Sequence, residues 1–214
     1  MKYFHPVNRH KPYVDWREPE HRKEFFFRWF QWRLDAELID HFLYTRAYTT
    51  SAAGPTGAPM NRAQKLWFSL LFGMTYNSSL AWVYYNHYPD PTNIEWDDLD
   101  KWNRATLDRQ PFQTDTRYNK GRIVAIWQSI AHWIHTEGGG DIERAFDKQI
   151  TSDATASYHN VHRQLLRLRK YGRMTAWLAA QCLYETAGLP IAPDTMFTDD
   201  PGNQSVWNGT CYYW

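Results

Sequence analysis

Residues 166–197, LRLRKYGRMTAWLAAQCLYETAGLPIAPDTMF, hold the arrangement around which the rest of the chain is organised. They contain a basic turn, an apolar helical stretch, a Gly-Leu-Pro break and then an aspartate, Asp194. Lys170, Tyr171 and Gly172 interrupt two helical patterns, and glycine takes up a positive φ in such a turn without a steric penalty. The stretch therefore predicts two helices joined by a tight corner, with Gly172 in the left-handed conformation.

The predicted corner is strongly basic. Residues 154–184 include five Arg or Lys and no Asp or Glu. The free N–H groups and the dipole at the start of a helix favour an anion, and Arg169, Lys170 and Arg173 add side-chain charge at this place. We expect these residues, together with Gly172, to seat the phosphate backbone of a nucleic acid.

Composition limits the classes of protein to which the chain can belong. Its 214 residues are enough for one domain with a sizeable core. A net charge of +1 is not that of a general nucleic-acid binder, so such binding has to come from a local patch. Aromatic residues make up 17% of the chain, including twelve Trp. A thick aromatic core is the first expectation, and surfaces for stacking on bases are the alternative.

Several functions are excluded or disfavoured by what the sequence lacks. Cys182 and Cys211 give neither a disulfide framework nor a metal cluster, and we expect no metal and no cofactor. No GxxxxGK[ST] motif is present, which excludes a P-loop kinase. The polar N-terminus lacks the apolar core of a signal peptide, and no apolar run approaches the length of a membrane span. We expect a cytosolic protein without a membrane partner.

Apolar spacing predicts helices along most of the chain. Residues 1–19 contain three prolines and are expected to form an extended arm, followed by a helical catalytic domain over 20–214. Apolar residues recur every three or four positions over 20–48. Further helices are predicted from 61, over 79–88, 96–107, 123–136 and 141–149, and from 157 into a hairpin near 168–176. No segment alternates like a strand. The predicted fold is a single all-α domain of eight to ten helices.

Three places outside the corner contain candidate functional residues. Asp40 and His41 lie beside an apolar face, where a solvated or capping role is expected and catalysis is the alternative. Gly73 indicates a close approach of the backbone to another helix or to a ligand. The polar loop 109–122 holds Asp115, Arg117, Asn119 and Lys120. Its cations suit a phosphate, while a solvated loop with an ion pair is the equal alternative.

Two family resemblances run through these motifs. GRMTA at 172–176 and DTMF at 194–197 resemble the helix-hairpin-helix and downstream aspartate of the DNA glycosylase superfamily, although Lys170 stands where that hairpin has its first glycine. A second resemblance covers roughly residues 25–212. QKLWF at 64–68, FGMTY at 72–76, TDTRYNKG at 114–121, GLP at 188–190 and WNG at 207–209 resemble the phage amino acid:DNA transferases, or α-glutamyl/putrescinyl thymine pyrophosphorylases. Related helical domains occur in phage 5-hydroxymethyluracil DNA kinases.

The second resemblance implies a step in the hypermodification of thymine in DNA. A 5-hydroxymethyluracil in double-stranded DNA, already activated by phosphate or pyrophosphate, would exchange that group for the amine of an amino acid or polyamine. Lacking a P-loop, this chain would be the transferase, with the DNA-base kinase as a further partner, in the cytoplasm of an infected bacterium.

Chemistry of this kind assigns roles to the candidate residues. Asp194 would be the general base or would stabilise the cation, with Asp115 as a second catalytic carboxylate. Arg117, Lys120 and Asn119 would hold the departing phosphate. Aromatic and polar residues would line the pocket for the extruded base or the amino acid: Arg62, Gln64, Trp67, Tyr76, Trp82 and Asn208. Two alternatives stay open, a helix-hairpin-helix DNA glycosylase and a non-catalytic DNA-binding or scaffold domain for a DNA-base kinase.

Overall fold

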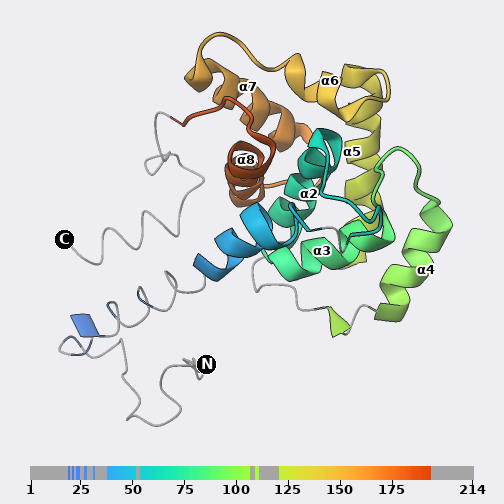
Figure 1. Cartoon of the computed structure of the whole chain (residues 1–214), viewed down its shortest axis with the longest axis horizontal. Helices are drawn as coiled ribbons and strands as arrows, with labels where there is room; N and C mark the ends of the chain where they lie inside the picture. The colour runs from blue at the N-terminus through green and yellow to red at the C-terminus, as the bar shows by residue number, and fades with distance from the viewer. Residues whose placement is uncertain are drawn as a thin grey trace.

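The computed structural model describes residues 38–51, 54–106, 109–110 and 121–193, with isolated positions between 19 and 31. Within these ranges the chain forms seven α-helices, one π-helix and no strand (Figure 1). The all-α prediction is confirmed for this part of the chain. The elements are η2 (Leu43–Ala47), α2 (Arg62–Thr75), α3 (Ser78–His87), α4 (Trp96–Thr106), α5 (Ile123–Gly138), α6 (Ile142–Asp147), α7 (Ala154–Arg167) and α8 (Arg173–Ala187). The predicted arm over 1–19 falls almost wholly outside the described residues.

Helix α2 lies at the centre of the fold. Asn61 caps its first turn in a reciprocal capping box with Gln64, as the Asn-x-x-Gln spacing favours. Every residue from Leu66 to Thr75 is buried. A helix that is buried on all sides has to be covered by other helices in every direction. α3, α6 and α8 pack against it.

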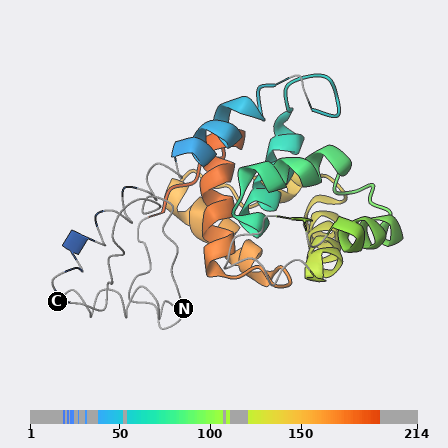
Figure 2. The ribbon, with the colours of Figure 1, turned by 90° about the horizontal axis from the view of Figure 1, so that it is seen from below.

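Helix α8 runs antiparallel to α2 and packs along its length. Near one end, Ser69 and Thr186 share a hydrogen bond of 3.1 Å, and near the other Tyr76 and Thr175 share one of 3.2 Å. Between them the backbones come closest at Gly73, where an added Cβ would lie 2.6 Å from the Cβ of Ala179. The expected close approach at Gly73 is therefore to a helix. Figure 2 shows the segment that ends in η2 lying against α8.

Aromatic side chains fill the other side of α2. Trp67 and Trp127 are fully buried, with their rings 5.0 Å apart and edge to face. Tyr84 packs on Trp127, and its hydroxyl lies within hydrogen-bond distance of Oε1 of Gln110, at 2.6 Å, and Oδ1 of Asn103, at 3.0 Å. Burial raises the pKa of Tyr84 far above its ordinary value, so the phenol stays protonated. For these residues the core expectation for the aromatic content is confirmed.

Local capping explains where the remaining helices begin and end. α7 starts at Ala154, ahead of the predicted position 157, because Asp153 accepts hydrogen bonds from the N–H groups of Thr155 and Ala156. α5 ends at Gly138, where Gly139 takes the left-handed conformation at its C-cap. None of the described helices is both long and apolar enough to cross a bilayer.

Candidate nucleic-acid interface

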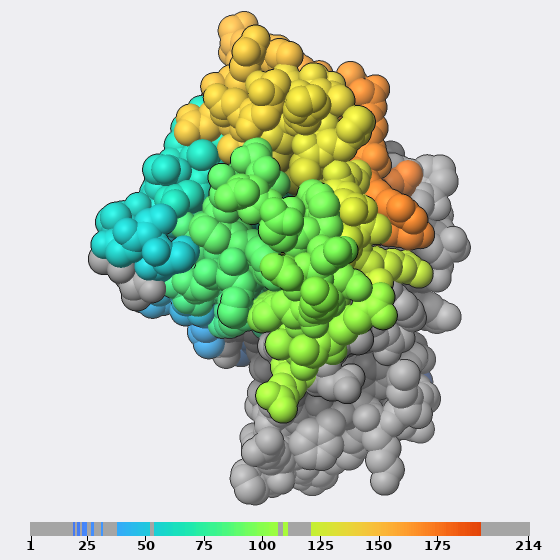
Figure 3. All heavy atoms as spheres, turned by 90° about the vertical axis from the view of Figure 1, so that its right-hand side faces the viewer, coloured from blue at the N-terminus to red at the C-terminus, as the bar shows by residue number. Residues whose placement is uncertain are grey.

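The corner between α7 and α8 is anchored by two apolar residues and exposes its basic ones. Leu168 and Tyr171 are buried, and the Tyr171 hydroxyl donates to the carbonyl of Leu70 on α2 at 2.6 Å. The backbone N–H of Arg169 donates to the Oγ of Ser129 on α5 at 2.9 Å. The turn is therefore tied to two helices, while the Arg169 and Lys170 side chains face solvent. Figure 3 shows the turn beside the start of α5 on one face of the molecule.

The backbone of the corner differs from the sequence prediction. Gly172 has φ −82° and ψ 177°, an extended conformation that any residue adopts. Lys170 takes the left-handed conformation, with φ +62°. The expectation for Gly172 was wrong, because the chain reverses two residues earlier, between the buried Leu168 and Tyr171. A left-handed non-glycine residue costs about 1–2 kcal/mol, which the two anchors offset. The two helices and their turn are present, but a helix-hairpin-helix in the strict sense is not established.

The first turn of α8 offers N–H groups to an anion. Gly172 is its N-cap and has no side chain to accept from them, and a Cβ built there would meet no atom within 4 Å. Helices α2, α3, α6 and α7 carry Asn or Asp at the same position. Arg173, the first residue of α8, is exposed. The open N-cap and the guanidinium together suit a phosphate oxygen.

Positive charge on this corner extends back along α7. Five cationic side chains, from the end of α7 through the turn to the first residue of α8, are all exposed: Arg163, Arg167, Arg169, Lys170 and Arg173. No ion pair with a described residue is recorded for Arg163, Arg169 or Lys170. Burial lowers the pKa of His162 on α7, and the nearby His159 and Arg173 lower it further. The guanidinium and ammonium groups therefore carry the positive charge of the corner near neutral pH.

Tyr76 joins the corner from the end of α2. Its hydroxyl lies 3.2 Å from the Oγ1 of Thr175 in the first turn of α8, and its backbone is left-handed, with φ +53°. Among the described residues, Tyr76 and Lys170 are the two non-glycine residues with positive φ, and they flank the same helix start. Such conformations gather at functional sites. The structure thus brings a predicted pocket residue, Tyr76, beside the corner residues that are predicted to bind the DNA backbone.

The other aromatic candidates lie elsewhere. Trp67 is fully buried and donates its indole N–H to the carbonyl of Tyr88 at 2.8 Å, so its ring belongs to the core. Trp82 on α3 is partly buried and stacks on Tyr48, with centroids 4.8 Å apart. Tyr76 and the two tryptophans therefore do not line one common cavity in this structure.

Gln64 and Arg62 lie at the far end of α2 from Tyr76. Gln64 lines a cavity of about 340 Å³ bounded also by the turns 89–92 and 140–142. Arg62 forms ion pairs with Asp147 at 2.5 Å and Glu143 at 3.0 Å on α6. The hydrogen bonds to Asp147 and Glu143 raise the pKa of Arg62. An amino-acid carboxylate at Arg62 would have to compete with both acids.

The remaining predicted site residues lie outside the described part of the chain. These are Asp194, Asp115, Arg117, Asn119, Lys120 and Asn208. Their assigned roles stay predictions. Among the described residues, no group of three or more His, Cys, Asp or Glu side chains could hold a metal ion.

Sequence reasoning missed a polar group between the 38–47 segment and α8. Glu185 accepts a hydrogen bond from Tyr44 and faces His41, while Gln181 donates to Tyr44. The sequence paired His41 with its neighbour Asp40. In the structure Asp40 accepts a hydrogen bond from the backbone N–H of Ser78 at the start of α3. Tyr44 and Glu185 are separated by 141 residues, so no local pattern joins them. The single available signal was an acid, Glu185, on the apolar α8.

The fold and this corner define an all-helical protein with a cationic, anion-attracting surface at a helix start. A family model described as amino acid:DNA transferase matches residues 39–214, and the chain belongs to that family. It is also similar to a protein of Salmonella phage ViI named serinyltransferase, with 23% identity over 205 residues. The match covers 93% of this chain and 49% of that protein, so the chain spans about half the length of its curated relative. No solved structure gives a significant match.

Proposed function

We propose that this chain transfers an amino acid onto a pyrimidine base of double-stranded DNA. The observation that carries the proposal is the family match over residues 39–214, which includes the cationic corner and every helix described here. The name of the phage relative makes serine the first donor to test. The base would be a 5-hydroxymethyluracil that a kinase has activated with phosphate or pyrophosphate.

The reaction is a substitution at the 5-methylene carbon. The amine nitrogen forms the new C–N bond, and the C–O bond to the phosphate breaks with its electron pair leaving on oxygen. The ammonium of the amino acid has to lose a proton to attack, and the leaving phosphate has to be neutralised. We assign the second task to Arg117, Asn119 and Lys120. Asp194 and Asp115 remain candidate catalytic carboxylates.

DNA would be held at the α7–α8 corner. The open N-cap at Gly172 and the side chains of Arg169, Lys170 and Arg173 suit phosphate oxygens, and contacts of this kind carry affinity without sequence readout. A target base must leave the stack to be modified, and its extrusion costs a few kcal/mol. Tyr76 lies at the corner and is the described aromatic candidate best placed to stack on a base of the strand held there.

The test is nucleoside mass spectrometry. The purified chain is incubated with a duplex carrying 5-phosphomethyluracil or its pyrophosphate, and with serine alone or the twenty amino acids together. A thymine-derived nucleoside heavier by one amino acid supports the proposal and names the donor. Loss of the base with an abasic site would identify a glycosylase instead. Binding of the duplex without any new nucleoside would indicate a scaffold domain.

A further inference from the structure

The polar group beneath the 38–47 segment is held rigidly. Tyr44 lies in the π-helix η2 and is 2% exposed, with its ring 4.8 Å from that of Phe72. Its hydroxyl donates to Oε2 of Glu185 at 2.6 Å and accepts from Gln181 at 3.4 Å. π-Helical turns are rare and occur often at functional sites. Here the π-helix directs a buried phenol at a carboxylate on another helix.

His41 completes the group on its solvent side. Its Nε2 lies 3.3 Å from the same Oε2 of Glu185, and its ring meets that of Tyr44 edge to face, with centroids 5.4 Å apart. The His41 side chain is 50% exposed and that of Glu185 21%. The carboxylate is therefore shielded while the imidazole is open to a substrate. This order, an exposed imidazole backed by a shielded carboxylate, fixes the orientation of the ring.

The group and the cationic corner lie at opposite ends of α8, and their residues are about 120° apart around the helix. Arg173 and Glu185 are twelve positions apart, about 18 Å along the helix axis. Trp177 and Tyr184 lie on the arc between them and are 38% and 58% exposed. A DNA strand that begins at the corner and follows α8 would cover this distance in about five nucleotides, at 3.4 Å per base step. Exposed aromatic rings on that path suit unstacked bases.

We propose that His41 is the general base of the transfer reaction, with Glu185 and Tyr44 as positioning residues. The inference rests on the proposed function. Nε2 faces Glu185, so Nδ1 takes the proton from the ammonium of the amino acid. The freed amine attacks the 5-methylene carbon, the C–O pair leaves with the phosphate, and the imidazolium returns its proton to that phosphate. Glu185 orients the imidazole ring, and Tyr44 fixes the carboxylate.

The experiment compares variants of the whole chain by their single-turnover rate on the 5-phosphomethyluracil duplex with the twenty amino acids. His41→Gln should lower the rate by about 100-fold or more, within the usual contribution of a general base. Glu185→Gln and Tyr44→Phe should lower it about tenfold or more. DNA affinity, measured by fluorescence anisotropy, should stay within about twofold, since the cationic corner is untouched.

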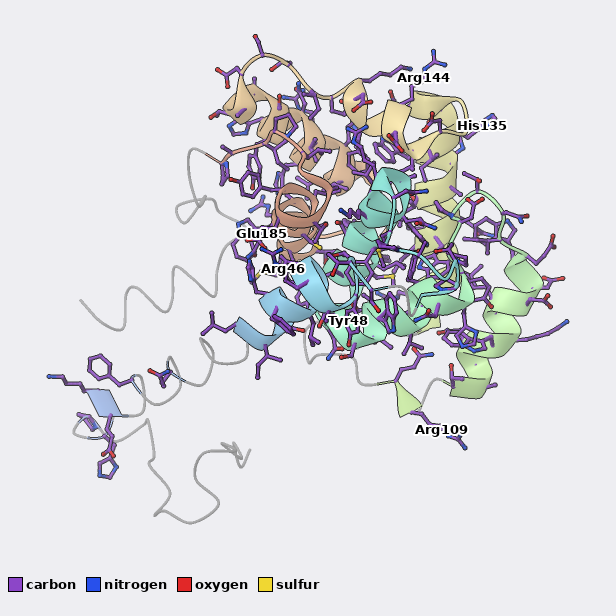
Figure 4. The ribbon with its side chains drawn as sticks, viewed as in Figure 1. Arg46, Tyr48, Arg109, His135, Arg144 and Glu185 are labelled. Atoms are coloured by element: carbon purple, nitrogen blue, oxygen red, sulfur yellow. The ribbon has the colours of Figure 1, made fainter. Side chains whose placement is uncertain are left out.

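Matched controls come from the same molecule. His135→Gln removes an exposed imidazole on α5, on the other side of the fold from Glu185, and Tyr48→Phe removes an exposed hydroxyl just after η2 (Figure 4). Both should keep the wild-type rate. Rates are expressed per folded protein, with the folded fraction taken from circular dichroism.

A purely structural role for His41 is separated by chemical rescue. In His41→Gly, added imidazoles should restore the rate, and the restored rate should rise with the basicity of the imidazole added. Rescue that does not depend on basicity, or a His41→Gln rate within threefold of the wild type, would overturn the role of His41 as general base and leave the proposed function standing. A wild-type chain that yields no aminated nucleoside would overturn the proposed function and this inference with it.

Discussion

Replacing Gly73 by alanine tests the closest helix contact in the fold. A Cβ at this position would lie 2.6 Å from the Cβ of Ala179, 2.7 Å from the carbonyl oxygen of Thr175 and 2.9 Å from the hydroxyl of Tyr171. Two of these three atoms cannot rotate away, because one is backbone and the other is a Cβ. The added methyl therefore has to push α8 away from α2.

The expected size of the effect comes from two opposing terms. In a helix interior, alanine is favoured over glycine by about 1 kcal/mol, so propensity alone predicts a more stable protein. Nonbonded carbon atoms prefer separations of about 3.5–4.0 Å, so α8 would have to move about 1 Å away from α2 at this contact. Overpacking of this kind costs about 1–3 kcal/mol or more. Because one of the contacting atoms is a backbone oxygen, we expect the clash to outweigh the gain in helix propensity. Gly73→Ala should lower the free energy of unfolding by about 2 kcal/mol.

Urea unfolding followed by circular dichroism measures the effect. At a slope of about 2–3 kcal/mol per molar urea, the midpoint should fall by about 0.7–1 M. In Gly138→Ala the new Cβ would lie 3.0 Å from the nitrogen of Ala145, so the urea midpoint should fall by less than in Gly73→Ala. Gly121→Ala meets nothing within 4 Å and should leave the midpoint unchanged. A Gly73→Ala protein as stable as the wild type, or more stable, would refute the reasoning.

Three further predictions concern the corner, an ion pair and the buried thiol. Lys170→Gly removes the strain of a left-handed lysine and should raise the free energy of unfolding by about 0.5–1 kcal/mol. It should also weaken DNA binding, and the salt dependence of the affinity should fall by the equivalent of about one phosphate contact. The hydrogen bond from Arg62 holds the pKa of Asp147 below its ordinary value, so their pair stabilises the fold above about pH 4 and this is lost as the pH falls. Asp147→Asn should therefore lower the Tm slightly at pH 7 and by less as the pH falls below about 4, and a Tm loss that stays the same in acid would contradict this. Burial raises the pKa of Cys182 to about 12, so in a Cys211→Ser chain it should react with a thiol reagent at about pH 8 only as the protein unfolds; prompt labelling of the native protein would show that it is accessible.

Much of the helix pattern could be predicted because it depends on neighbours in the sequence. The start of α2 at Asn61 follows from a capping box within four residues, and the end of α5 follows from its glycines. The contact at Gly73 was predicted as a close approach because only a residue without a side chain permits one. The partner of that contact was left open until the fold placed α8 against α2.

The candidate site was predicted less completely. The exposed cations of the corner follow from a run of Arg and Lys without acids, and their exposure is as expected. The left-handed residue was misplaced, because Lys170 is constrained by anchors on other helices and glycine preference had no influence there. Trp67 and Tyr76 belong to one predicted pocket but lie in the core and at the corner, respectively.

By itself the sequence determined the helical class, the positions of most helices, the cationic corner and the resemblance to the amino acid:DNA transferases. Each of these is carried by residues close together in the chain or by short motifs. Only the tertiary structure decided that Arg62 pairs with α6, and that Tyr44 and His41 meet Glu185. These partners are 81 to 144 residues apart in the chain. Contacts at such separations depend on how whole helices pack, and helix packing is set by the summed burial of many side chains rather than by the residues that finally touch.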